Sequence, residues 1–296
     1  MAVIATGFFD GVHLGHRLVI DTLVSNAKAR GEESVVLTFW PHPRTVLQDG
    51  ARDLRLLTTL EEKKALLTSL GVDRVEVIRF TKEFSRLSTE EYLRDVVKGK
   101  YGGTAILLGY DNRMGRNAGT PDEISLKASE LGLDVIRTDS VPSGKEGDRA
   151  ISSTLIRSLI SDGEVEAAAS LLGYNYSMLG VVVAGNRLGR TIGFPTANMQ
   201  LYEPLKLVPG NGAYLVDVEV LGGKFKGMCN IGVRPTVGSS LARTIETNIF
   251  GFNEDIYGLD MSISFIRRIR PEMKFSSLQE LAAQLETDRR YCLSCE

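Results

Sequence analysis

The sequence predicts an α/β protein in two parts, a parallel sheet covered by helices and then a small antiparallel β-barrel with a terminal helix. Strands and helices alternate along the first half, whereas strand-like runs follow one another in the second half. The texture changes after Gly173, so we expect one domain over residues 1–173 and a second over residues 174–296. A chain of 296 residues is long enough for two ordinary domains.

The first half alternates short apolar or β-branched runs with helical patterns. The expected strands are 3–5, 34–39, 74–80, 104–109 and 134–138, and the expected helices are 17–30, 59–70, 88–98 and 122–131. Two of these helices open with the spacing of a capping box, Thr59 with Glu62 and Ser88 with Glu91. In such sheets ligands bind beyond the carboxyl ends of the strands, which is where the turn after the first strand lies.

The second half begins with a helical pattern over residues 152–172 and then becomes rich in strands. The expected strands are 178–184, 213–221, 225–231, 244–250 and 261–269. Gly222 and Gly223 separate two of them, which is a strong hairpin signal. One clear helix follows, over residues 278–286, with Ser277 and Glu280 as its capping box.

Composition restricts the class of protein. The net charge of -2 gives no general attraction to nucleic acid or to anionic membranes, and no apolar run approaches the roughly 20 residues of a membrane span. No basic and then apolar leader opens the chain, so we expect a cytoplasmic protein without nucleic-acid or membrane partners. The three cysteines do not form a disulfide framework. Cys292 and Cys295 have C-x-x-C spacing, which suits a metal or redox site, but a frayed tail explains them better.

The most informative segment is GFFDGVHLGH, at residues 7–16. It holds two of the three histidines, His13 and His16, at a turn between a strand and a helix. Backbone N–H groups at a helix start favour anions, and two imidazoles add donors directed at the same point. We therefore expect a phosphate site. The alternative is a tight turn with two surface histidines, which would explain the glycines but not the pair of histidines.

Two further segments follow predicted strands. TFWPHP, at residues 38–43, holds the third histidine, His42, between two prolines that fix the backbone. A rigid loop with an incidental histidine is the other interpretation. LGYDNRMGRNAG, at residues 108–119, has glycine, aspartate and arginine residues where a nucleotide could be held, although an ordinary polar glycine loop explains it equally well.

A third segment, ISSTLIR at residues 151–157, opens a helix. Adjacent hydroxyls at a helix start, with Arg157 one turn later, form a second phosphate clamp. One hydroxyl would be needed in any case as an N-cap. Ser153, Thr154 and Arg157 together exceed what capping alone requires.

In this order, these segments resemble the bacterial bifunctional riboflavin kinase/FAD synthetase family, whose first half is a Rossmann-like nucleotidyltransferase domain with an HxGH motif. The resemblance covers essentially the whole chain. It implies that the FMN phosphate attacks the α-phosphorus of ATP and that pyrophosphate leaves. By this resemblance His13 and His16 stabilise the developing charge, Ser153, Thr154 and Arg157 hold the β- and γ-phosphates, and the turn residues Gly7, Phe9, Asp10 and Gly11 face adenosine and ATP.

The glycine loop departs from the family pattern G-x-D-F-x-F-G. Asn112 and Met114 stand where the family has aromatic residues. His42, Asp111 and Asn112 are the candidate flavin or adenine contacts. The departure leaves the phosphate-handling residues unchanged.

The densest motif of the second half is GVVVAGNRLGRTIGFPTAN, at residues 180–198. Gly185, Gly189 and Gly193 let the backbone approach a phosphate chain. Thr196 and Asn198 lie on one side of an extended chain, and both offer hard oxygen ligands suited to Mg²⁺. A glycine hairpin with a polar exit is the plainer interpretation.

This motif resembles the riboflavin kinase signature of the same family, as do NIGVRPT at residues 230–236 and IETNIF at residues 245–250. The resemblance implies transfer of the ATP γ-phosphoryl group to the riboflavin 5′-hydroxyl, with Glu246 as general base. Thr196 and Asn198 would bind Mg²⁺ and phosphate. The glycines just named, Arg190 and Asn230 would complete the ATP site. Many family members have histidine where Asn248 stands. A surface carboxylate on a strand is the alternative for Glu246.

We therefore expect a two-domain enzyme that makes FMN and then FAD from riboflavin and two ATP, with Mg²⁺ required in both halves. Flavin is substrate and product here. One alternative is a riboflavin kinase with a weakened adenylyltransferase half, suggested by Asn112 and Met114. Another is a flavin-binding protein without turnover, which would predict loss of the catalytic side chains.

Overall fold

The computed structural model describes residues 1–48, 53–110, 112–116, 118–142, 150–185, 188–235 and 241–295. The chain folds into two compact units, residues 1–153 and residues 154–296, which are described separately. Each unit contains its own sheet.

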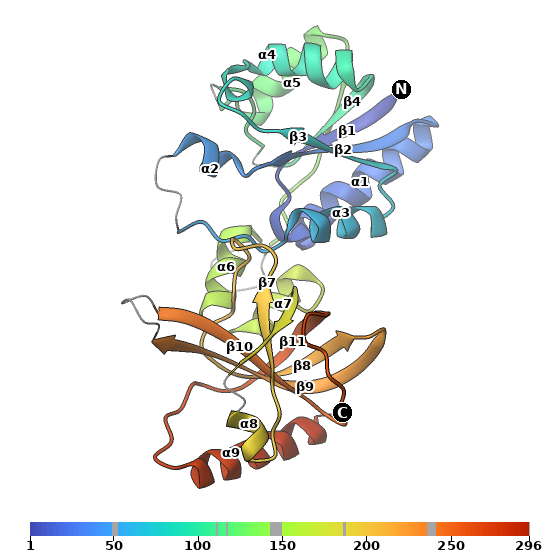
Figure 1. Ribbon diagram of the computed structural model, residues 1–296. Helices are drawn as coiled ribbons and strands as arrows, with labels where there is room; N and C mark the ends of the chain where they lie inside the picture. The colour runs from blue at the N-terminus through green and yellow to red at the C-terminus, as the bar shows by residue number, and fades with distance from the viewer. Residues whose placement is uncertain are drawn as a thin grey trace. The chain divides into compact units, whose positions relative to one another are not determined.

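The first unit is built on a five-stranded parallel sheet with strand order β3-β2-β1-β4-β5 (Figure 1). Its strands are β1 (Ala2–Thr6), β2 (Glu33–Trp40), β3 (Arg74–Arg79), β4 (Gly103–Leu108) and β5 (Asp134–Arg137). The three central strands are almost wholly buried, which explains their nearly continuous apolar sequences.

Helices cover both faces of this sheet (Figure 1). On one face α1 (Leu14–Arg30) and α3 (Leu60–Ser69) pack on alternate strand residues such as Val3 and Ala5. On the other face, the π-helix η4 (Tyr92–Lys100) and α5 (Pro121–Glu130) pack on the residues between them, such as Ile4. The shorter helical elements of this unit are η1 (Asp10–Val12), α2 (Pro43–Leu47), η3 (Phe84–Arg86) and α4 (Thr89–Glu91).

The strand order reverses at β1, which has β2 on one side and β4 on the other. After β1 the chain crosses one face through α1, whereas β4 is reached only after β3 and η4. A crevice forms outside the carboxyl ends of two strands at such a reversal, and ligands bind there. The segments that follow β1 and β4 are the histidine turn and the glycine loop.

The second unit is a closed antiparallel barrel with strand order β10-β7-β6-β11-β8-β9. Its strands are β6 (Ser177–Val183), β7 (Ala197–Leu201), β8 (Gly212–Val220), β9 (Gly223–Pro235), β10 (Leu241–Ile249) and β11 (Asp260–Arg270). β8 and β9 form the hairpin that the paired glycines predict.

Four helices belong to this unit or lead into it, namely α6 (Ser153–Ser161), α7 (Val165–Leu172), α8 (Leu188–Thr191) and α9 (Leu278–Ser294). α7 packs against β11. α9 buries Cys292 against Phe194, Leu215 and Met228 on the outer face of the barrel. Asp288 of the same helix, 3% exposed, pairs with Arg270 of β11 at 2.8 Å and so anchors the helix to the barrel.

The predicted fold class is confirmed in both halves. Several elements differ from the expectation. α2 begins at Pro43 of the Pro-His-Pro segment, the motif ending at Asn198 continues into strand β7, and residues 92–100 form a π-helix. α9 continues to Ser294, so Cys292 lies in a helix and not in a frayed tail. The two compact units divide after Ser153, and α7 packs on the barrel. The predicted functional boundary at Gly173 stays a prediction. The assignment of an activity to each predicted domain stays a prediction.

Candidate functional site

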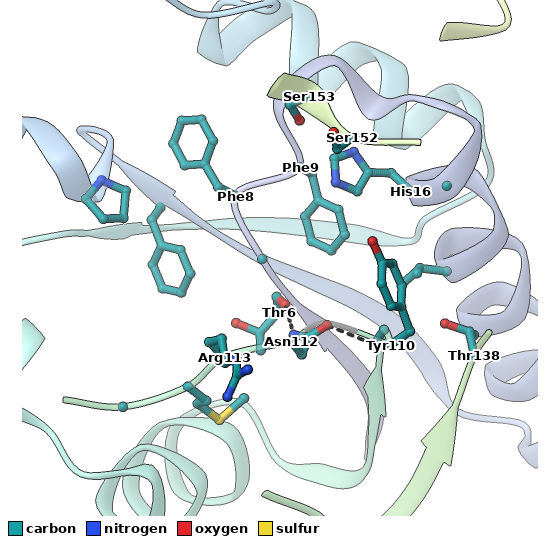
Figure 2. A pocket seen from close by; sticks show the side chains of 18 of the residues that line it. Thr6, Phe8, Phe9, His16, Tyr110, Asn112, Arg113, Thr138, Ser152 and Ser153 are labelled. Carbon is teal, nitrogen blue, oxygen red and sulfur yellow. Dashed lines mark hydrogen bonds between the residues drawn. The ribbon is translucent and has the colours of Figure 1, made fainter. Parts of the chain in front are cut away.

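The first unit contains a cavity of about 720 Å³ at the carboxyl ends of β1 and β4 (Figure 2). Residues from the histidine turn, the glycine loop and the end of the unit line it together. They include Gly7, Phe9, His13, His16, Asn112, Ser152 and Ser153. The structure thus brings together three segments that are far apart in the sequence.

The histidine turn is held in a strained conformation. Phe9 and Val12 have φ of 54° and 37°, in the left-handed region that residues other than glycine avoid. Gly11, between them, also has a positive φ, of 79°. Each such non-glycine residue costs about 1–3 kcal/mol, so the conformation persists only where the surrounding structure holds it. The carboxylate of Asp10, 3% exposed, accepts hydrogen bonds from the backbone N–H groups of Leu57 and Thr58 at 3.0 and 3.1 Å. Asp10 therefore anchors the turn to the segment that precedes α3.

The two imidazoles lie against each other. The rings of His13 and His16 stack with centroids 3.7 Å apart, and Phe9 meets His16 edge-on at 5.2 Å. His13 is the N-cap of α1, and its Nδ1 accepts a hydrogen bond from the backbone N–H of His16 at 3.3 Å. A Cβ on Gly15 would lie 3.2 Å from the His13 ring, so the glycine of the motif leaves room for this arrangement.

His16 is held in its neutral form. Burial, followed by the charges of His13 and Lys63, lowers the pKa of His16 well below its ordinary value of 6.5. Its Nδ1 is buried and has no hydrogen-bond partner among the described residues. A neutral imidazole with one unpaired nitrogen can donate a hydrogen bond to an anion. It can also take up a proton when an anion lies beside it.

The clamp predicted at residues 151–157 is divided between the two units. The hydroxyl of Ser153 donates to the backbone carbonyl of Asp10 at 2.9 Å and lines the cavity. Ser153 thus helps to fix the histidine turn. Thr154 and Arg157 belong to the second unit, where the Arg157 guanidinium donates to the Thr154 hydroxyl at 3.5 Å.

The glycine loop ties two strand ends together through Asn112 (Figure 2). Its Oδ1 accepts from the backbone N–H of Gly109 at 2.8 Å, and its Nδ2 donates to the carbonyl of Thr6 at 3.2 Å. Asn112 is therefore a structural bridge between β4 and β1 as well as a lining residue. Asp111, the other candidate of this loop, lies outside the described residues.

An aromatic wall closes one side of the cavity, and the sequence analysis did not identify it. Its members are Phe8, Phe39, Phe80, Phe84 and Tyr92. Phe80 and Phe84 meet edge-on at 5.7 Å, and Phe84 meets Tyr92 at 5.9 Å. These residues come from different elements, so their grouping is visible only after folding. His42 packs on Phe8 with ring centroids 4.2 Å apart and is not among the residues that line the cavity.

In the second unit, three predicted residues lie in a row across the barrel. Glu246 of β10 is directly opposite Asn198 of β7 on one side and Asn230 of β9 on the other. Directly opposed residues share a face of the sheet. The hydroxyl of Thr196 donates to the carboxylate of Glu246 at 3.4 Å. Thr196, Asn198, Asn230 and Glu246 are thus brought together.

The glycines of the motif allow close packing around this row. A Cβ on Gly185 would lie 2.2 Å from the side-chain amide of Asn198, and a Cβ on Gly189 would lie 2.1 Å from the carbonyl of Phe194. Gly193 has φ of 84°, at the turn into the following strand. Arg190 lies in the short helix α8 and is exposed.

A cavity of about 390 Å³ adjoins this row. Arg190, Pro195, Thr196 and Thr247 line it, together with residues 252–257. Side chains alternate along β10, so Thr247 faces the opposite side of the strand from Glu246. Thr196 lines the cavity and also contacts Glu246, so it joins the cavity to the carboxylate.

The donors at this row suit a hard cation that is mainly bound by phosphates. A hydroxyl, an amide oxygen and a carboxylate are the ligand types that Mg²⁺ accepts while it keeps water and phosphate oxygens. Within the described ranges, the structure has no group of three or more histidine, cysteine or acidic side chains that could hold a metal ion by itself.

Among the residues that the structure describes, no helix combines the length and the apolar character needed to span a bilayer.

Comparison with known proteins agrees with this geometry. The family model for FAD synthetase matches residues 1–155, and the model for riboflavin kinase matches residues 172–295. The matched ranges contain the histidine turn and the Glu246 row, respectively.

Relatives that match almost the whole chain are named for two activities, riboflavin kinase and FMN adenylyltransferase. A bifunctional riboflavin kinase/FMN adenylyltransferase of Bacillus subtilis is 38% identical over 98% of this chain and 90% of its own length. The Escherichia coli protein of the same name is 36% identical over 97% and 90%. A crystal structure from Streptococcus pneumoniae, described as a macrolide-efflux protein, superposes with a TM-score of 0.92 at 32% identity and covers 100% of this chain and 94% of its own. The chain belongs to the bifunctional riboflavin kinase/FMN adenylyltransferase family.

Proposed function

We infer that this chain phosphorylates riboflavin to FMN and then adenylylates FMN to FAD, with ATP as the second substrate of both reactions. The observation that carries the inference is that both family models match side by side along the chain, each over a site whose polar side chains are present. Relatives named for both activities match over almost their full length.

We propose that residues 1–173 carry adenylyl transfer and residues 174–296 carry the kinase reaction. The separate sheets of the two units support this division. Helices α6 and α7 stand between the parts that the models match, apart from the first residues of α6. Because α7 packs against β11, its removal would affect the kinase half first.

In the kinase half, the riboflavin 5′-hydroxyl attacks the γ-phosphorus of ATP, and ADP leaves. The hydroxyl must lose its proton, and Glu246 is the general base in our proposal. Its carboxylate is near the Thr196 hydroxyl, which supports a common role at the phosphate. Phosphoryl transfer depends mainly on alignment and charge stabilisation, which the row of Asn198, Asn230 and Glu246 suits.

Mg²⁺ belongs to this proposal. Thr196 and Asn198 would hold it in the kinase half, where bound Mg²⁺ neutralises charge on the transferring phosphoryl group. Gly185 and Gly189 pack closely against Asn198 and Phe194, which supports a role of these glycines in fixing the proposed ligand Asn198. Arg190 adds a positive side chain beside the second cavity.

In the adenylyltransferase half, a phosphate oxygen of FMN attacks the α-phosphorus of ATP, and pyrophosphate leaves. We propose that His13 and His16 stabilise the negative charge on the transferring group, with Ser153 beside the leaving phosphates. The phosphate-binding roles of Thr154 and Arg157 stay predictions. The backbone of Gly7, Phe9 and Gly11, shaped by Asp10, would face the nucleotide. The aromatic wall gives the cavity a surface suited to a flavin ring.

We also propose a cytoplasmic location and substrates limited to riboflavin, FMN and ATP. All three cysteines are free thiols, as expected in a reducing compartment. The net charge of -2 gives no reason to expect nucleic acid as a partner.

One assay tests the whole proposal. Purified protein is given riboflavin, ATP and Mg²⁺, and the flavins are separated by chromatography over time. We expect FMN first and FAD later. Accumulation of FMN without FAD would instead support a kinase with a weakened adenylyltransferase half. Binding of flavin without any conversion would support the non-catalytic alternative.

A further inference from the structure

The first turn of α3 contains a lysine that takes no part in the proposed reaction steps. Lys63 is fully buried, with 0% of its surface exposed. Lysine is almost never fully buried unless a partner compensates its charge. The next residue, Lys64, is partly exposed and pairs with Glu61, so burial is specific to Lys63.

The ammonium group of Lys63 holds Phe8 in two ways. Its Nζ donates to the backbone carbonyl of Phe8 at 2.7 Å and lies 3.6 Å from the centroid of the Phe8 ring. It also donates to the hydroxyl of Thr38 at 3.2 Å, and that hydroxyl donates to the same carbonyl. A cation over an aromatic face and a charge-assisted hydrogen bond both strengthen when water is excluded.

Phe8 connects this buried contact to the site. It lines the cavity with its side chain (Figure 2) and begins the strained turn at Phe9. Because a peptide group is planar and trans, fixing the Phe8 carbonyl also fixes the Phe9 N–H, which points the opposite way. Lys63 therefore holds both the Phe8 ring at the cavity and the start of the turn that leads to His13.

The charged and titratable groups that face Lys63 are Asp10 of the turn and His16 of α1. The neighbouring strand β2 contributes the Thr38 hydroxyl, which stays neutral. Burial lowers the pKa of Lys63 to about 8, and the charge of Asp10 acts in the opposite direction. Lys63 is thus charged at neutral pH and loses its proton under mildly alkaline conditions.

We propose that Lys63 is a positioning residue for adenylyl transfer, acting through the carbonyl and the ring of Phe8. The inference rests on the proposed function of the first unit and deepens it. Lys63 is not among the residues that line the cavity, so it acts on the substrates only through the turn.

Replacement of the side chain tests this role. Lys63→Met keeps the length of the stem but loses the charge and the donors. We expect kcat/KM for FAD formation from supplied FMN to fall roughly 100-fold, the usual loss when reacting groups are misplaced by about 1 Å. Lys63→Arg, which keeps charge and donors, should retain more activity than Lys63→Met. Lys64→Met is the matched control on the same helix and should behave like the wild type.

The pH profile separates positioning from a merely structural role. For the wild type, kcat/KM for FAD formation should fall as pH rises through about 8, since that is where Lys63 loses its proton. In Lys63→Arg this fall should be absent, because guanidinium stays charged. FMN formation from riboflavin by the same preparations is the internal reference and should not change among these variants.

Each outcome decides the proposal. A wild type that makes no FAD overturns the proposed function itself. A wild type that makes FAD, with Lys63→Met equally active or with Lys63→Arg showing the same alkaline fall, overturns the role of Lys63 alone. Circular dichroism and thermal unfolding report whether Lys63→Met folds. If it does not fold, the comparison of the wild-type and Lys63→Arg pH profiles decides.

Discussion

The side-chain amide of Asn248 donates a hydrogen bond to the backbone carbonyl of Pro195 at 2.7 Å. Asn248 is 8% exposed and shares its face of β10 with Glu246, two residues earlier. Pro195 directly precedes Thr196, whose hydroxyl contacts Glu246. Asn248 thus connects the strand of the proposed base to the segment of the proposed metal ligand.

Loss of this hydrogen bond should slow the kinase reaction. Asn248→Leu leaves the Pro195 carbonyl without its donor and shifts Thr196, so we expect turnover of riboflavin to fall about 10- to 100-fold. Asn248→His should retain more activity than Asn248→Leu if its ring N–H donates to the same carbonyl. Steady-state rates of FMN formation measure this, and FAD formation from supplied FMN is the control. Equal activity of Asn248→Leu and wild type would contradict the prediction.

Glu246→Gln should remove kinase activity selectively. The amide keeps the size of the carboxylate but cannot accept the proton of the riboflavin hydroxyl, and loss of a general base typically costs about 100- to 10,000-fold. FMN formation should fall by that order, while supplied FMN is still converted to FAD. For His16→Ala we expect FMN formation to continue and conversion of FMN to FAD to be lost. If either folded variant lost both activities, the assignment of the two reactions to the two sites would be wrong.

The stability of the first unit should fall as pH drops below about 6.5. The pKa of His16 is lowered in the folded chain relative to its ordinary value of 6.5, so the unfolded state binds the proton more readily. Protonation below pH 6.5 therefore favours unfolding. In His16→Gln, which cannot be protonated, the free energy of unfolding should depend less on pH between 6.5 and 5. Denaturant unfolding followed at several pH values measures this, and parallel curves for the two proteins would contradict it.

Asn112→Ala should weaken the adenylyltransferase half. The change removes both hydrogen bonds that tie Gly109 to Thr6, and each partner left unpaired costs about 1–3 kcal/mol. We expect a lower unfolding temperature and slower FAD formation. Asn112→Asp keeps an acceptor for Gly109 but loses the donor to Thr6, so it should lie between alanine and the wild type. An unchanged unfolding temperature for Asn112→Ala would show that the bridge is not needed.

Much of the fold could be predicted from local signals. The capping boxes at Thr59 and Ser88 form as expected, with both reciprocal hydrogen bonds. The hairpin turns at Leu221 and Gly222, which both have positive φ, and Gly222 adopts this conformation without steric cost. The histidine motif lies at the cavity because a turn after the first parallel strand must end at that edge of the sheet.

Other features could not be predicted, because they depend on residues that are distant in the sequence. The Pro-Thr-Ala-Asn segment becomes strand β7 because β6 and β10 pair with it. Lys63 follows an ordinary capping box, and only the packing of α3 against the histidine turn buries its charge. The aromatic wall joins β2 to residues near β3 and to η4.

Periodicity, turn chemistry and motifs were enough to predict the two-part α/β and β-barrel architecture and the family, and they point to candidate residues for both phosphate sites. The contacts of those residues became visible only in the folded chain. The tertiary structure assigned Asp10 and Asn112 to hydrogen bonds within the fold and set Thr196 against Glu246. The physical reason is that a side chain's partners and burial are set by which segments pack together, which local pattern does not specify.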